Sequence, residues 1–99
     1  MEKLSNNTNA LNWFEIPVTD IERAKRFYES AFEIEMNSAE MMGMKMAMFP
    51  SQSPKTGGAL VQSPSHKPSA EGAIVYLNAN PDLQTVLDRI ESNGGKVTM

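Results

Sequence analysis

Several residue types that carry common chemistry are missing or scarce in this 99-residue sequence. It has no cysteine, which excludes disulfide bonds, thiolate catalysis and cysteine-ligated zinc, and it has one histidine, His66. Nine basic residues against twelve acidic ones give a net charge of −3, so the basic surface of a nucleic-acid-binding protein is absent. The longest apolar run, residues 73–77, is far shorter than the roughly 20 residues that cross a membrane. We therefore expect neither a nucleic acid nor a membrane as a partner.

The remaining composition is that of a small globular domain. Hydrophobic residues make up 40% and charged residues 21% of the chain, which are ordinary values. Residues 1–10 form a polar leader without the apolar stretch of a signal peptide. Together with the absence of cysteine, this leader predicts a cytoplasmic protein.

Residues 11–18 are predicted to form the first strand. Period-two alternation places Phe14 and Ile16 on one face and Trp13 and Glu15 on the other. The strand therefore carries an apolar face and a mixed face, and the mixed face is where we look for chemistry.

A helix is predicted to follow this strand at once. Thr19 and Glu22 have the spacing of a capping box, so the helix begins at Thr19. Apolar residues then recur at three- and four-residue spacing on one stripe, namely Ile21, Ala24, Phe27, Tyr28 and Ala31. We expect Tyr28, and Tyr76 later in the chain, to pack between helix and sheet.

Three more strands are predicted before residue 64. Residues 33–38 form a short one, and residues 41–50 alternate with period two, which is typical of a strand. Turn residues at 51–55 separate this strand from the next, residues 56–63, in which Gly57 and Gly58 indicate a turn or bulge. The alternation places four methionines on one face: Met42, Met44, Met46 and Met48.

The same order restarts after a Pro- and Ser-rich linker at residues 64–72. Residues 73–79 predict a strand, Asn80 a helix cap, and Gly94 with Gly95 the end of that helix. A last strand is predicted at residues 96–99. Corresponding residues of the two halves lie 62 positions apart, which favours an internal repeat.

The residues that open each half resemble a known family. The run at residues 13–20, followed by Ala24 and by Phe27 and Tyr28, is similar to the opening of the vicinal oxygen chelate superfamily, and residues 73–95 repeat the match. That superfamily contains glyoxalase I, the bleomycin- and fosfomycin-resistance proteins and the extradiol dioxygenases. The resemblance implies an α+β fold of paired βαβββ modules whose sheets curl around a cavity.

On this resemblance, residues 11–63 are the first module and residues 73–99 a partial second one of order β-α-β. A complete second module would need about two more strands, so the resemblance leads us to expect a truncated chain.

The resemblance also implies where a metal would be held, by four His or Glu side chains. The first position falls on Trp13, the second on Val61 or Gln62, and the third on Ala73 or Val75. The fourth would lie in a strand that this sequence does not contain. None of these residues is a ligand for a divalent ion, so we predict no metal and no other cofactor.

The predicted cavity wall comprises Trp13, Glu15, Met46, Met48 and Gln62. Glu15 is either a catalytic base, for which it is a weak candidate, or a solvated carboxylate at the cavity mouth. Trp13 either stacks on a ligand or fills the space that a metal site would occupy.

Two other features bear on function. Six of the eight methionines lie between residues 36 and 48. They form either an adaptable binding surface or part of the core packing. His66, in the linker, is expected to be a free, exposed imidazole, because Ser63 and Ser65 lack the sharp turn of a nucleophile.

Three functions remain open on these grounds. The first is a small-molecule-binding protein, similar to the resistance proteins, with a metal-independent cavity. The second is a divergent lyase, isomerase or dioxygenase-like enzyme, and the third is an oligomeric scaffold. Because an incomplete second module exposes strand edges, we also predict a homodimer, with strands or modules exchanged between subunits.

Overall fold

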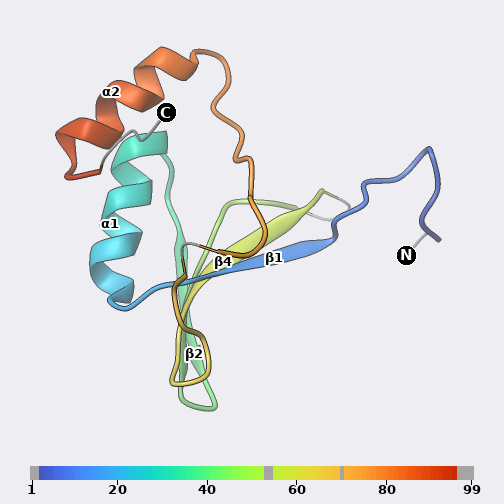
Figure 1. Ribbon diagram of the computed structural model, residues 1–99, viewed down its shortest axis with the longest axis horizontal. Helices are drawn as coiled ribbons and strands as arrows, with labels where there is room; N and C mark the ends of the chain where they lie inside the picture. Colours follow the sequence, from blue (N-terminus) through green and yellow to red (C-terminus); the bar gives the residue numbers. More distant parts are fainter. Residues whose placement is uncertain (1–2, 53–54, 70, 96–99) are drawn as a thin grey trace.

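A four-stranded mixed sheet carries the first half of the chain in the computed structural model, which describes residues 3–52, 55–69 and 71–95 (Figure 1). The strand order is β1-β4-β3-β2, with β1 parallel to β4 and the other neighbours antiparallel. The strands are β1 (Trp13–Pro17), β2 (Asn37–Met41), β3 (Met44–Met48) and β4 (Gly57–Gln62). With helices α1 (Ile21–Phe32) and α2 (Leu83–Ser92), they confirm the predicted α+β class. In the described part of the chain, no helix is long and apolar enough to span a membrane.

Helix α1 begins one residue later than the sequence predicts. Asp20, not Thr19, is the N-cap, and its carboxylate accepts a hydrogen bond from the Arg23 amide at 3.2 Å. An aspartate in extended backbone reaches the amide three residues on, so the predicted capping box is wrong. The helix ends at Phe32, and its C-cap residue, Glu33, has a left-handed backbone with φ 52°.

Strands β2 and β3 form a hairpin whose turn lies within residues 41–50, where the alternation predicted a single strand. Met42 and Gly43 both have positive φ, 49° and 79°, as in a type I′ turn. Met42 is therefore not part of the methionine row but lies at the tip of the hairpin, 96% exposed. Strand β2 begins at Asn37, so the predicted strand at 33–38 was placed too early.

The main core lies between α1 and one face of the sheet. Ile21 of α1 packs with Ala47 of β3 and Leu60 of β4, both fully buried. Tyr28 joins this core as predicted, and its ring centroid lies 5.6 Å from that of Phe49. Helix α2 contacts α1 and none of the strands (Figure 1).

The opposite face of the sheet, called the open face below, is packed against neither α1 nor α2. Met46, Ala59 and Val61 are buried on it, with Met44 and Met48 packed against them. The strand register assigns these residues to the open face: Trp13, Glu15, Ala39, Met41, Met44, Met46, Met48, Ala59 and Val61.

Gly57 and Gly58 lie within strand β4 and form neither a turn nor a bulge. They pair with Trp13 and Phe14 of β1, whose rings lie over them on opposite faces. A Cβ on Gly58 would overlap the Phe14 ring, and one on Gly57 would lie 3.3 Å from Trp13 Cζ3. Glycine is needed at position 58 because the Phe14 ring occupies the space of a side chain there, whereas the nearest atoms at position 57 belong to the exposed Ser51 side chain.

The second half of the chain agrees with prediction less well. Residues 73–79 form no strand, because no neighbouring strand of the described residues pairs with them and a strand needs a partner for its amides. Tyr76 is 91% exposed, so it does not pack as predicted. Helix α2 is capped by Asp82, not Asn80, and ends before Gly94, whose φ of 92° fits the predicted glycine stop. The strand predicted at residues 96–99 lies outside the described residues.

Candidate functional site

Four of the five predicted pocket residues lie together on the open face. Trp13 and Glu15 come from β1, and the register places Glu15 beside Ala59 of β4. Met48 of β3 lies on the other side of Ala59, and Met46 lies one row further along. The small β4 residue thus separates a polar, aromatic wall on β1 from a methionine wall on β3.

The fifth residue, Gln62, lies on the other face. Its side-chain Oε1 accepts a hydrogen bond from the Ile21 amide at 2.8 Å, which satisfies an amide at the start of α1. The structure therefore does not bring Gln62 together with the other four. Gln62 borders a separate pocket of about 420 Å³, which is also lined by Val18, Thr19, Gly43, Lys45, Ser63, Pro64, His66, Lys67 and Pro68.

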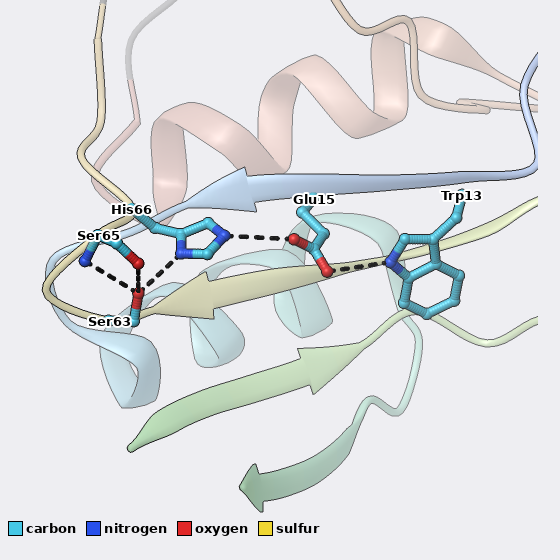
Figure 2. A network of polar contacts seen from close by, with 5 residues as sticks. All are labelled: Trp13, Glu15, Ser63, Ser65 and His66. Atoms are coloured by element: carbon cyan, nitrogen blue, oxygen red, sulfur yellow. Dashed lines mark hydrogen bonds and ion pairs between the residues drawn. The ribbon is translucent and has the colours of Figure 1, made fainter. Parts of the chain in front are cut away.

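A network of polar contacts crosses the edge of the open face (Figure 2). Trp13 Nε1 donates to Glu15 Oε2 at 3.3 Å, and His66 Nε2 lies 3.3 Å from Glu15 Oε1. Both oxygens of the carboxylate are thus engaged, one by a tryptophan and one by the only histidine. With a protonated His66 the second contact is an ion pair.

The far side of the His66 ring is held by a turn. The His66 amide donates to the Ser63 carbonyl at 3.2 Å, and Ser63 Oγ lies 2.7 Å from His66 Nδ1. Ser65 supports the same hydroxyl through its amide, 3.3 Å from Ser63 Oγ, and through its own Oγ at 3.2 Å. Figure 2 shows the chain of contacts running from the two serines through His66 and Glu15 to Trp13.

The prediction that His66 is a free, exposed imidazole is therefore wrong. Its side chain is 27% exposed, and both ring nitrogens have partners. The turn at residues 63–66 returns the chain toward β1, where Glu15 lies. The serine- and proline-rich turn was visible in the sequence, whereas the parallel pairing of β1 with β4 that brings Glu15 close was not.

A second cavity, of about 760 Å³, lies on the α1 side of β1, where sequence reasoning predicted no site. None of the predicted pocket residues lines it. An ion pair between Glu33 and Arg89 lies at its border. Its apolar lining includes Leu11, Phe14, Phe32, Ile34, Phe49, Val75, Leu77 and Val86.

The residues at the positions that the superfamily uses for a metal do not fit one. Trp13 is hydrogen-bonded to Glu15, Val61 is fully buried, and Gln62 holds the start of α1. Within residues 3–52, 55–69 and 71–95, no three His, Cys, Asp or Glu side chains lie close enough to share an ion. Glu15 and His66 supply two donors, fewer than a divalent metal centre needs. That the protein requires no metal remains a prediction.

Comparison with known proteins adds one finding. No curated protein and no solved structure matched the chain. The family model described as Glyoxalase/Bleomycin resistance protein/Dioxygenase superfamily matches residues 10–99, which is most of the sequence. The match agrees with the α+β class and the four-stranded mixed sheet of the structure. The chain therefore belongs to the Glyoxalase/Bleomycin resistance protein/Dioxygenase superfamily.

Proposed function

We propose that this protein binds a small molecule on the open face without a metal ion. The observation that carries the proposal is a hydrogen-bonded carboxylate, Glu15, set beside a methionine-rich sheet face that neither helix covers. Binding sites for small molecules combine apolar walls with a few placed polar groups, and the open face has this composition.

The polar end of the face suggests what a ligand would offer. An ionised carboxylate accepts hydrogen bonds and donates none, so Glu15 favours a ligand with an N–H or O–H group. Trp13 is 45% exposed beside it, which leaves part of the indole free to stack on a planar ring. We therefore propose an aromatic or other flat apolar ligand that carries at least one hydrogen-bond donor.

The methionine wall suggests how such a ligand would be accommodated. Ala59 and Val61 are fully buried beneath the side chains of the open face, so a ligand must displace some of those side chains. Met48 is half-buried at the surface of this layer. A methionine side chain is unbranched and repacks easily, which suits a pocket that opens on binding.

The fluorescence of Trp13 gives a direct test, because it is the only tryptophan in the chain. We expect planar phenols and aromatic amines from a screening panel to change its emission and to raise the melting temperature. Glu15→Gln should weaken binding of any such compound, and Glu40→Gln is the matched control, since Glu40 faces the other side of the sheet. Equal affinity in the two variants, or no response across the panel, would refute the proposal.

Metal independence is tested separately. Adding nickel, zinc or manganese should leave the melting temperature of the protein unchanged, because the donor set is too small for tight binding. A rise of several degrees that EDTA reverses would overturn this part of the proposal. Binding of the organic compounds should likewise be the same in the presence and absence of EDTA.

A second candidate is an enzyme in which Glu15 acts as a general base. It is favoured by the contact between Glu15 and His66, because a proton taken up at the carboxylate has a neighbouring imidazole as its next acceptor. The reaction class would be that of a lyase or isomerase. Once a ligand is known, the His66→Ala variant separates the two candidates. Turnover of the ligand by the wild type, together with binding but no turnover by the variant, supports the enzyme.

We also propose that the protein is a homodimer. Strands β1 and β2 are the two edges of the sheet, and an unpaired edge offers its backbone groups to another chain. The segment at residues 73–79 has no regular secondary structure and exposes Ile74 and Tyr76, so we propose that it lies against such an edge in a second subunit. This pairing would give the segment the strand neighbour that it lacks among the described residues of its own chain.

A further inference from the structure

Three methionines occupy neighbouring positions at the turn end of the β2–β3 hairpin, outside the polar network. Met41 and Met44 are direct partners across the two strands, next to the type I′ turn. Met46 follows Met44 on the same face of β3 and is paired with Ala39. The three side chains therefore project from neighbouring positions of the open face, held in register by the turn.

The spacing of these positions allows their sulfur atoms to converge. Directly opposed Cβ atoms lie about 5 Å apart, successive same-face positions of a strand about 7 Å, and diagonal neighbours about 8 Å. A point equidistant from the Cβ atoms of Met41, Met44 and Met46 is thus about 4 Å from each. Cγ and Sδ of each methionine cover part of this distance, and a metal–sulfur bond of about 2.3 Å covers the remainder. Each side chain has three rotatable bonds with which to reach this geometry.

The surroundings select for a soft ion. Ala39 and Val61 lie next to Met46 on the open face and offer no side-chain oxygen or nitrogen. Glu40 and Lys45, which adjoin the methionines in sequence, are paired on the other face. Thioether sulfur favours copper(I) over hard or borderline divalent ions.

We propose that Met41, Met44 and Met46 form a three-coordinate thioether site for copper(I), and for silver(I) as its redox-inert analogue. Met41 is 54% exposed and gives an ion access from solvent, whereas Met46 is 8% exposed and shields the bound ion. The site uses neither Glu15 nor His66 and does not depend on the small-molecule binding proposed above. It accounts for methionine at three neighbouring positions where leucine would fill the same space.

The test is a silver(I) titration of the full chain in chloride-free buffer, followed by calorimetry and native mass spectrometry. We expect one ion per chain, and a loss of affinity of at least about tenfold in Met41→Leu, Met44→Leu and Met46→Leu. Leucine preserves volume and apolarity, so these variants should keep the fold, which circular dichroism checks. Met48→Leu is the matched control, because Met48 lies on the same face and strand but outside the triangle, and it should bind silver as the wild type does.

Copper(I) under ascorbate, measured by competition with bicinchoninate, should give the same ranking of variants. No silver binding by the wild type, an equal loss in the Met48→Leu control, or retained binding in the triple variant would overturn the proposal. Loss of silver binding in His66→Ala would also overturn it, because the imidazole would then be the ligand. Failure of this site would leave the Trp13 fluorescence response to organic ligands unaffected, so the two proposals fail separately.

Discussion

Replacing Gly58 by alanine should destabilise the protein, although alanine in a strand is ordinarily the better residue. Gly58 is buried in β4 directly beneath the ring of Phe14, and a Cβ there would overlap ring carbons Cδ1, Cε1 and Cζ. A shift of the Phe14 ring would disturb its packing against Phe49, whose ring centroid lies 5.6 Å from its own. The cost is therefore that of overpacking a core.

The magnitude follows from two opposing terms. Overpacking costs about 1–3 kcal/mol, and the lower entropy of an unfolded chain with alanine returns about 0.4–1 kcal/mol. We expect a net loss of about 1–2 kcal/mol, which for a domain of this size lowers the melting temperature by roughly 5–10 °C. Gly57→Ala is the control. Its Cβ would meet the exposed, movable Ser51 side chain and lie 3.3 Å from Trp13 Cζ3, so we expect a change within about 0.5 kcal/mol.

The assay is urea unfolding followed by circular dichroism, applied to both single variants and to the double variant Gly58→Ala with Phe14→Leu. The smaller leucine makes room for the new methyl group, so the double variant should lose less stability than the sum of the two single changes. Equal effects of Gly57→Ala and Gly58→Ala, or strict additivity in the double variant, would refute the account in which the Phe14 ring requires a glycine.

Further predictions address the core, two titrating groups and assembly. Leu60→Ala should cost about 2–5 kcal/mol in urea unfolding, because the side chain is fully buried between α1 and the sheet; a cost below about 1 kcal/mol would contradict this core. Burial raises the pKa of Tyr28 above 10.0, so at high pH the unfolded chain releases a proton that the folded chain keeps, and the free energy of unfolding should fall as pH rises past 10.0. Tyr28→Phe should flatten this part of the pH profile. The pKa of Asp82 is lowered below 3.8, chiefly by the hydrogen bond from the Thr85 side chain, so the stability that its carboxylate gives to α2 is present above pH 3.8 and is lost as pH falls through the pKa of the folded state. Circular dichroism should show this loss of helix in the wild type and not in Asp82→Asn. Light scattering at micromolar concentration should give twice 10.9 kDa, and a stable 10.9 kDa species would contradict the dimer.

Local signals in the sequence were sufficient for β1 and α1. The alternation in β1 places Phe14 and Ile16 toward the helix and Trp13 and Glu15 on the open face, as predicted. The apolar stripe of α1 likewise identifies the buried side of that helix, with Ile21 in the core. Errors in this region are shifts at element ends, such as the cap of α1, and the unrecognised β2–β3 turn at Met42 and Gly43.

The candidate site could be predicted only in part, because its contacts are not local. Glu15 and His66 are 51 residues apart, and only the parallel pairing of β1 with β4 brings the turn at residues 63–66 next to the carboxylate. The position of Gln62 also depends on a contact that is not local, because its side chain accepts a hydrogen bond from the Ile21 amide, 41 residues earlier in the sequence. Residues 73–79 have strand propensity, but a propensity becomes a strand only where a neighbour supplies hydrogen bonds.

The exposed segment without a strand partner in the described residues also has a consequence for self-assembly. Its seven residues, 73–79, are rich in β-branched and aromatic side chains and contain no charge, no proline and no glycine. Stretches of this composition stack into cross-β fibrils when they are exposed. Glu71 before the segment and Pro81 after it interrupt the pattern on both sides, as gatekeeper residues do. Shielding of this segment should therefore decide whether the protein stays dispersed or forms fibrils at high concentration.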